Sequence, residues 1–147
     1  MKIALIGYGK MGHMIENIAT IRGNEVVATV DYVSPDAKYI VKSSQEGADV
    51  ISQVKPDVVI DFTHPNEAFN NIKAFLPLGM PIVVGTTGWT SRLKEVEELV
   101  KQHNNALFYA GNFSIGVNMF YRIIENASRL MAQYDEYDSA IWEAHHN

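Results

Sequence analysis

The glycine-rich stretch Gly7-Tyr8-Gly9-Lys10-Met11-Gly12 constrains the fold more than any other part of the sequence. It follows a short apolar run, Ile3 to Ile6, and precedes a segment whose apolar residues recur at helical spacing. A second apolar run, Val26 to Val30, comes next and is closed by Asp31. A buried strand, a glycine turn, a helix and a second strand form a βαβ unit, so we expect a parallel sheet to begin here.

The pattern of strand and helix continues through the middle of the chain. Apolar runs predict strands at 58–62, 81–84 and 106–109, with a short strand at 39–41. Helices are predicted to start after Ser43-Ser44, at Pro65 and at Thr90, because proline is tolerated in a first helical turn and threonine is a good N-cap. The apolar stripe of the first helix is predicted to comprise Met11, Met14, Ile15, Ile18 and Ile21.

This alternation predicts an α/β fold, a Rossmann-like doubly wound parallel sheet, over residues 1–111. The rhythm changes after Gly111: Ser114 precedes a long amphipathic helix, and 137–142 alternate like a half-buried strand. We interpret 112–147 as the start, a long helix plus a strand, of a second α+β domain that is incomplete. Ligands of the first domain are expected at the carboxyl ends of its strands.

The composition excludes several classes of site and partner. The chain has 147 residues and a formal net charge of −5, which argues against nucleic acid as the main partner. It contains no cysteine, so it forms no disulfide and no thiolate zinc site, which suits a reducing cytoplasm. No apolar run approaches the roughly 20 residues of a membrane span, so we expect no membrane partner.

The glycine stretch matches the G-x-G-x-x-G pattern of dinucleotide-binding loops, with Asp31 placed at the end of the second strand. Gly7 would permit a tight turn, Gly9 would let the backbone approach a pyrophosphate, and Gly12 would let helix and strand pack closely. A carboxylate at Asp31 would bind the ribose hydroxyls and repel a 2′-phosphate, so we predict NADH in preference to NADPH. The alternatives are ordinary turn glycines and a solvated Asp31.

Three more stretches fall at predicted strand ends and could meet the nicotinamide. They are Asp61-Phe62-Thr63 with His64, Gly85-Thr86-Thr87-Gly88, and Ala110-Gly111-Asn112-Phe113-Ser114. Small residues leave backbone groups open to a carboxamide, and a phenyl ring can line one face of a nicotinamide. Each stretch taken singly could equally be a turn with no binding role, and the simplest interpretation of His64 is a loop residue.

The sequence ends in Ile141-Trp142-Glu143-Ala144-His145-His146-Asn147. Adjacent residues of a strand point to opposite faces, so the two histidines cannot readily hold one ion together. We therefore predict no metal site.

Five stretches occur in the same order and at similar spacing as in one known family: IGYGKMG, IDFTHPNEA, VVGTTGW, YAGNFSIGVN and EAHHN. On these stretches nearly the whole chain resembles dihydrodipicolinate reductase (4-hydroxy-tetrahydrodipicolinate reductase). The resemblance implies a two-domain enzyme of diaminopimelate and lysine biosynthesis that is a homotetramer in most bacteria, and the lack of cysteine favours a cytoplasmic location. It also implies reduction of a cyclic imine dicarboxylate with NADH or NADPH.

The resemblance assigns roles to individual residues. It implies that the glycine loop holds the pyrophosphate, that Asp31 faces the adenosine ribose, and that positions 85–87 and 110–113 line the nicotinamide. It assigns His145 to proton transfer and His146 to substrate binding. Residues 112–147 would then begin the domain that binds substrate and forms the oligomer.

Two departures from the family pattern bear on activity. The glycine loop is one residue shorter than in many relatives, which leaves open whether Lys10 contacts a phosphate or is solvated. The family motif continues past the two histidines into a lysine and a D-x-P-S-G-T segment, which this sequence lacks. We expect the chain alone, as part of a longer reductase, to bind cofactor but to be poorly active. The alternatives are a non-catalytic NAD-binding module and another two-domain NAD-dependent dehydrogenase.

Overall fold

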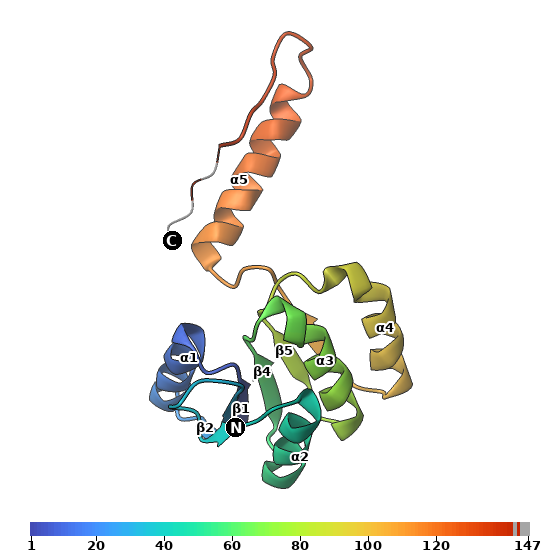
Figure 1. Cartoon of the computed structure of the whole chain (residues 1–147). Helices are drawn as coiled ribbons and strands as arrows, with labels where there is room; N and C mark the ends of the chain where they lie inside the picture. The colour runs from blue at the N-terminus through green and yellow to red at the C-terminus, as the bar shows by residue number, and fades with distance from the viewer. Residues whose placement is uncertain (143, 145–147) are drawn as a thin grey trace. The chain divides into compact units, whose positions relative to one another are not determined.

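The computed structural model describes residues 1–142 and 144 and divides into two compact units, Met1–Gly111 and Asn112–Asn147 (Figure 1). The first unit is built on a six-stranded sheet in the order β3-β2-β1-β4-β5-β6, with every neighbouring pair parallel. The strands are β1 Lys2–Ile6, β2 Glu25–Asp31, β3 Tyr39–Ile40, β4 Val58–Asp61, β5 Ile82–Val84 and β6 Leu107–Tyr109. The predicted α/β fold with a doubly wound parallel sheet is confirmed.

Helices and short 3₁₀ turns connect these strands. They are α1 Lys10–Ile21, α2 Ser44–Val54, α3 Pro65–Phe75, η1 Leu76–Leu78, η2 Thr90–Arg92 and α4 Leu93–Gln102. The core is divided by the sheet: one cluster joins Ala4 and Ile6 of β1 to α2, α3 and α4, and the other joins Ile3 and Leu5 to α1. Helices therefore cover both faces, with α1 on one side and α2 to α4 on the other (Figure 1).

The strand order places one topological switch point in the sheet. The chain leaves β1 toward β2 on one side, whereas β4 leads to β5 on the other side. The loops that follow β1 and β4 must diverge to opposite faces, so they leave a crevice at the carboxyl ends of these two strands. The candidate site is built there.

Local sequence signals explain where most helices begin. The Ser43 hydroxyl caps α2 by accepting from the Glu46 amide at 3.2 Å, and Pro65 occupies the first turn of α3. The prediction that Thr90 caps the fourth helix is wrong, because Thr90 lies inside the 3₁₀ turn η2 and α4 begins at Leu93 with no side-chain cap. The turn continues directly into the helix, so no extended residue stands before it to act as a cap.

The predicted apolar stripe of α1 is also wrong in part. The buried residues of this helix are Gly12 and Ala19, whereas Met11, Met14 and Ile18 are exposed and Ile21 has 72% of its surface exposed. Small residues on the inward face bring the helix axis close to the sheet. Ile15 of the predicted stripe packs against the core on this face of the sheet, whereas the other long side chains of the stripe are exposed.

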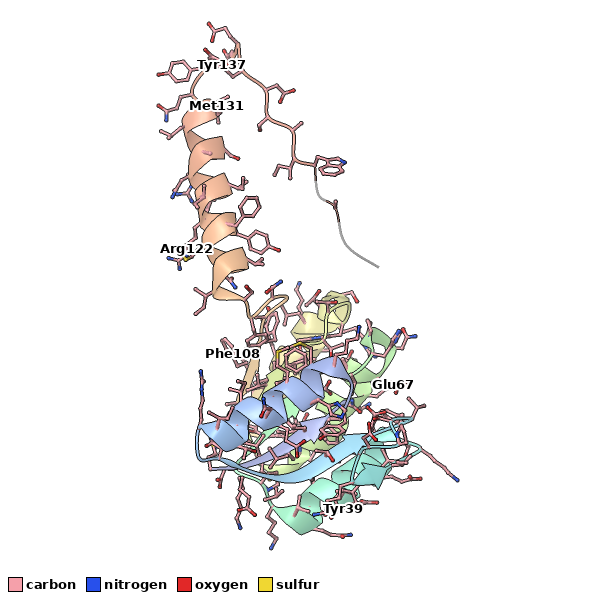
Figure 2. The ribbon with its side chains drawn as sticks, turned by 90° about the vertical axis from the view of Figure 1, so that its left-hand side faces the viewer. Tyr39, Glu67, Phe108, Arg122, Met131 and Tyr137 are labelled. Carbon is pink, nitrogen blue, oxygen red and sulfur yellow. The ribbon has the colours of Figure 1, made fainter. Side chains whose placement is uncertain are left out.

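The second unit contains a long helix, α5 Ile115–Met131. The helix follows Ser114, as the sequence predicts, and the Ser114 hydroxyl caps it by accepting from the Val117 amide. Figure 2 shows Met131 at the end of α5 and Tyr137 in the turn beyond it. The chain then runs back along the helix, and Ile141 and Trp142 border an apolar cavity of about 430 Å³ on its side.

The predicted strand at 137–142 is not formed. A strand needs a neighbour to receive its backbone hydrogen bonds, and the described part of the second unit contains no other strand. No helix among residues 1–142 and 144 is both long and apolar enough to cross a membrane.

We expect Ile72→Ala to lower the free energy of unfolding by about 2–5 kcal/mol, because Ile72 is fully buried in the α3 face of the core. Ile21→Ala is the matched control on α1, and we expect a change within about 0.5 kcal/mol at that exposed site. Urea denaturation followed by circular dichroism measures both. Equal losses would contradict the division into buried and exposed helix faces.

Candidate functional site

The glycine turn after β1 makes its closest approach to the end of β4. Gly7 has φ +88°, and a Cβ placed on it would stand 2.3 Å from the carbonyl oxygen of Phe62. Its amide also donates to the carbonyl of Val30 at 2.9 Å, at the end of β2. Both the left-handed backbone and the lack of space require glycine here.

The other two glycines of the motif have different surroundings. A Cβ on Gly12 would stand 2.5 Å from the carbonyl oxygen of Gly7, so this position sets the close approach of α1 to the turn. A Cβ on Gly9 would meet no atom within 4 Å. Gly9 is also the N-cap of α1, and no side chain caps this end of the helix. The first turn of α1 therefore has no side-chain cap, and Gly9, Lys10 and Met11 line the cavity described below, an arrangement that suits an anion.

Asp31, at the end of β2, is held by three backbone amides. One carboxylate oxygen accepts from Tyr8 at 2.6 Å, and the other accepts from Val33 and Ser34, both at 2.8 Å. Partial burial raises the pKa of this carboxyl, but the backbone hydrogen bonds outweigh burial and hold the pKa below its ordinary value. Asp31 is consequently ionised at neutral pH and ties the glycine turn to the loop after β2.

The side chain of Tyr8 turns into the protein and leaves only its backbone in the loop. The ring is 7% exposed, stacks on His13 with 4.0 Å between centroids, and donates its hydroxyl to the Glu16 carboxylate. That hydrogen bond, burial and the nearby negative charge raise the pKa of Tyr8 to about 12. His13 Nδ1 lies 2.8 Å from the carbonyl oxygen of Gly9. These contacts between α1 and the glycine turn stabilise the turn. The glycine motif did not predict roles for His13 and Glu16 because neither residue belongs to it.

A cavity of about 470 Å³ opens between the glycine turn and the ends of β4 and β5. It collects eight of the predicted site residues from three separate loops. Its lining residues are Gly9, Lys10, Met11, Phe62, Thr63, Pro65, Gly85, Thr86 and Thr87. A Cβ on Gly85 would stand 2.1 Å from the Phe62 ring, so the ring lies directly against the backbone after β5.

The loop after β5 is anchored from below by an aromatic residue. The indole of Trp89 is 2% exposed, donates to the carbonyl of Thr86 at 2.9 Å, and meets the Tyr109 ring edge to face. This hydrogen bond from a buried indole holds Gly85 to Thr87 at the cavity wall. The sequence offered a signal for this, since Trp89 directly follows the Gly-Thr-Thr-Gly stretch.

Beneath the cavity lies a buried polar pair, of which Asp61 stands in a stretch predicted from the sequence and Asn71 does not. Asp61 ends β4 and Asn71 lies on α3, and both are fully buried and joined by a 2.9 Å hydrogen bond. Burial raises the pKa of the Asp61 carboxyl above its ordinary value, against the opposing effect of its hydrogen bonds. A usable signal was present, because Asn71 falls on the apolar stripe of α3 beside Ile72.

The structure brings part of the last predicted loop to the site. The Ala110 amide donates to the carbonyl of Val84, and a Cβ on Gly111 would stand 4.0 Å from the methyl of Thr87. Asn112 and Phe113 belong to the second unit, in which the Asn112 side chain accepts from the Ser114 amide. His145 and His146 lie outside the described residues. Within the described ranges, no three histidine, aspartate or glutamate side chains are grouped to hold a metal.

Comparison with known proteins assigns the sequence to a family. Residues 1–113 match the family described as "Dihydrodipicolinate reductase, N-terminus". The chain belongs to the dihydrodipicolinate reductase family. The 4-hydroxy-tetrahydrodipicolinate reductase of Christiangramia forsetii is 36% identical over 146 residues, which are 99% of this chain and 56% of that protein. The enzyme of the same name from Staphylococcus aureus is 36% identical over 148 residues, which are 57% of its length.

Solved structures support the same fold. The dipicolinate-bound dihydrodipicolinate reductase of Paenisporosarcina has a TM-score of 0.72 at 24% identity, covering 87% of this chain and 53% of that one. A hyperthermophilic archaeal homoserine dehydrogenase in complex with NADPH has a TM-score of 0.59 at 19% identity, covering 74% and 43%. The chain therefore shares its fold with these two proteins. The chain spans a little over half the length of the reductases that it matches.

We expect Asp31→Asn to lower the free energy of unfolding by about 1–3 kcal/mol at pH 7, because an amide cannot accept all the hydrogen bonds of the carboxylate. The native pKa of Asp31 lies below its unfolded value, so this contribution is present at neutral pH and shrinks as pH falls below roughly 4 toward the native pKa.

Urea denaturation of both proteins from pH 7 to pH 3 measures the difference. The exposed substitution Glu98→Gln is the control for a general loss of negative charge. A difference between wild type and Asp31→Asn that grows on acidification would contradict the prediction.

Proposed function

We propose that residues 1–111 bind NADH, with the pyrophosphate at the start of α1 and the nicotinamide in the cavity beside Phe62 and Thr86. The observation that carries the proposal is the uncapped first turn of α1 opening, through Gly9, into a cavity at the switch point of a parallel sheet. When bound, the cofactor supplies a hydride from its nicotinamide ring.

Preference for NADH over NADPH forms part of the proposal. The depressed pKa of Asp31 keeps a negative charge at the end of β2, where the adenosine ribose would lie. Neither Tyr32 nor the exposed Val33 carries a cation that could pair with a 2′-phosphate. The Tyr32 hydroxyl is itself bonded to Asn71 at 3.0 Å. These features favour two free ribose hydroxyls at this point.

The substrate proposed for the complete protein is 4-hydroxy-tetrahydrodipicolinate, reduced to tetrahydrodipicolinate. Family membership supports this reaction, and the resemblance assigns proton transfer to His145 and substrate contact to His146. Imidazole suits the protonation step because its ordinary pKa, near 6.5, is close to physiological pH. A homotetramer of the complete protein and roles for Asn112 and Phe113 at the nicotinamide rest on the same resemblance.

We expect the chain to bind NADH at least about tenfold more tightly than NADPH, because the Asp31 carboxylate repels a 2′-phosphate. Titration with the reduced cofactors, followed by their fluorescence, measures both dissociation constants. Gly9→Ala is the matched variant: its added methyl meets no protein atom but would stand where the pyrophosphate approaches. It should weaken NADH binding about tenfold or more. Absence of NADH binding by wild type would refute the proposal.

We expect this chain alone to reduce the substrate at least about 10²-fold more slowly than a complete member of the family, since the lysine of the family motif is absent from its sequence. A coupled steady-state assay with NADH measures this rate. Addition of a polypeptide that carries the C-terminal portion of a related reductase should raise it. Near-normal activity of the chain alone would contradict the expectation, and another substrate reduced faster would favour a different dehydrogenase.

A further inference from the structure

A hydrogen-bonded network surrounds the carboxylate of Asp61 at the end of β4. One oxygen accepts from the Thr63 amide at 2.9 Å, from the Thr63 hydroxyl at 2.7 Å and from the Thr86 hydroxyl at 3.2 Å. The other oxygen accepts from Asn71 at 2.9 Å. Among the described residues, no buried polar side-chain atom lacks a partner. The carboxylate is therefore a common acceptor for groups from three different elements.

The network continues toward β2. The Tyr32 hydroxyl donates to the Asn71 side-chain oxygen at 3.0 Å and lies 3.1 Å from the Ser44 hydroxyl. Tyr32 directly follows Asp31, the residue proposed to face the adenosine ribose. The hydrogen bonds thus run from the loop after β2, through α3, to the loops after β4 and β5.

The position of the network points to function beyond packing. A fully buried carboxylate is costly to desolvate, and an apolar side chain would fill the same space at lower cost. Two of the groups that Asp61 holds, Thr63 and Thr86, line the cavity proposed for the nicotinamide. The carboxylate itself is fully buried and does not line this cavity.

We propose that Asp61 is a positioning residue for the nicotinamide end of the site. It holds Thr63 and Thr86 in place at the cavity wall, and Asn71 links this arrangement to the loop after β2. The inference rests on the proposed dinucleotide binding. It assigns Asp61 no contact with the cofactor.

The hydrogen-bond directions explain how one carboxylate can orient both hydroxyls. The Thr63 hydroxyl donates to Asp61 and accepts from Asn71 at 3.2 Å. The single proton of the Thr86 hydroxyl is shared between Asp61 and the Thr63 carbonyl, which is 3.1 Å away. In Asp61→Asn, an amide NH₂ would face a donor from Thr63 or Asn71, so at least one of these groups must turn away.

The test compares two ligands that differ only in the nicotinamide portion: NADH and ADP-ribose. We expect Asp61→Asn to raise the dissociation constant of NADH about tenfold, while the dissociation constant of ADP-ribose changes less than about twofold. The fluorescence enhancement of bound NADH should fall as well. Calorimetry measures the ADP-ribose affinity, and fluorescence titration measures the NADH affinity.

Ile72→Val is the matched control, because it changes the adjacent buried residue of α3 without touching the network. It should lower the melting temperature without altering the ratio of the two affinities. A second pair covers the case in which Asp61→Asn does not unfold cooperatively. Thr86→Val, which removes the hydroxyl, should weaken the binding of NADH but not that of ADP-ribose. Thr86→Ser, which keeps the hydroxyl, should have an NADH dissociation constant within about twofold of the wild-type value.

The outcomes separate this inference from the proposed function. If wild type binds neither ligand, the dinucleotide site itself is refuted. If wild type binds both ligands, and the variants weaken the two affinities equally or leave both unchanged, Asp61 has only a structural role and the inference is overturned. A selective loss of NADH supports it.

Discussion

The close contact between the glycine turn after β1 and the end of β4 is the constraint on which the site depends. A side chain at Gly7 would overlap the backbone of Phe62, so the two loops can meet only with glycine at that position. Because they meet, α1 starts at the switch point of the sheet with its first turn uncapped by any side chain. The helix end proposed to bind the pyrophosphate and the cavity beside it both lie at this contact.

Two kinds of support hold this arrangement in place. Around the glycine turn, Asp31 binds three backbone amides and Tyr8 packs inward against His13. At the cavity floor, the Asp61 network and the buried indole of Trp89 hold the loops after β4 and β5. Hydrogen bonds from buried side chains therefore hold the loops that line the cavity. Such preorganisation lowers the cost of ordering a site when a ligand binds.

The second unit has a different character. Its helix α5 has no buried residue, and Phe120 and Ile123 are more than half exposed although the apolar spacing of the helix is regular. The turn near Tyr137 and the segment that returns along α5 cover only part of this surface (Figure 2). The chain spans a little over half the length of its relatives, and we propose that catalysis belongs to the complete protein.

Patterns local in the sequence predicted most of the architecture. Apolar runs located the strands, Pro65 located the start of α3, and the three glycines located the turn, because each of these signals depends on neighbours within a few positions. The signal failed at α1 and at 137–142. Whether an apolar stripe is buried, or an alternating segment becomes a strand, depends on partners distant in the sequence.

The same contrast between local sequence patterns and contacts distant in the sequence applies to the site. The sequence by itself determined which residue types stand at the ends of β1, β2, β4 and β5, and therefore that small, polar and acidic groups would gather at one edge of a parallel sheet. Only the tertiary structure decided what they do there. It turned the Tyr8 ring inward, engaged Asp31 with backbone amides and joined Asp61 to Asn71 and Thr86. These pairings cross between elements, and hydrogen bonds of this kind depend on distances that spacing along the chain does not encode.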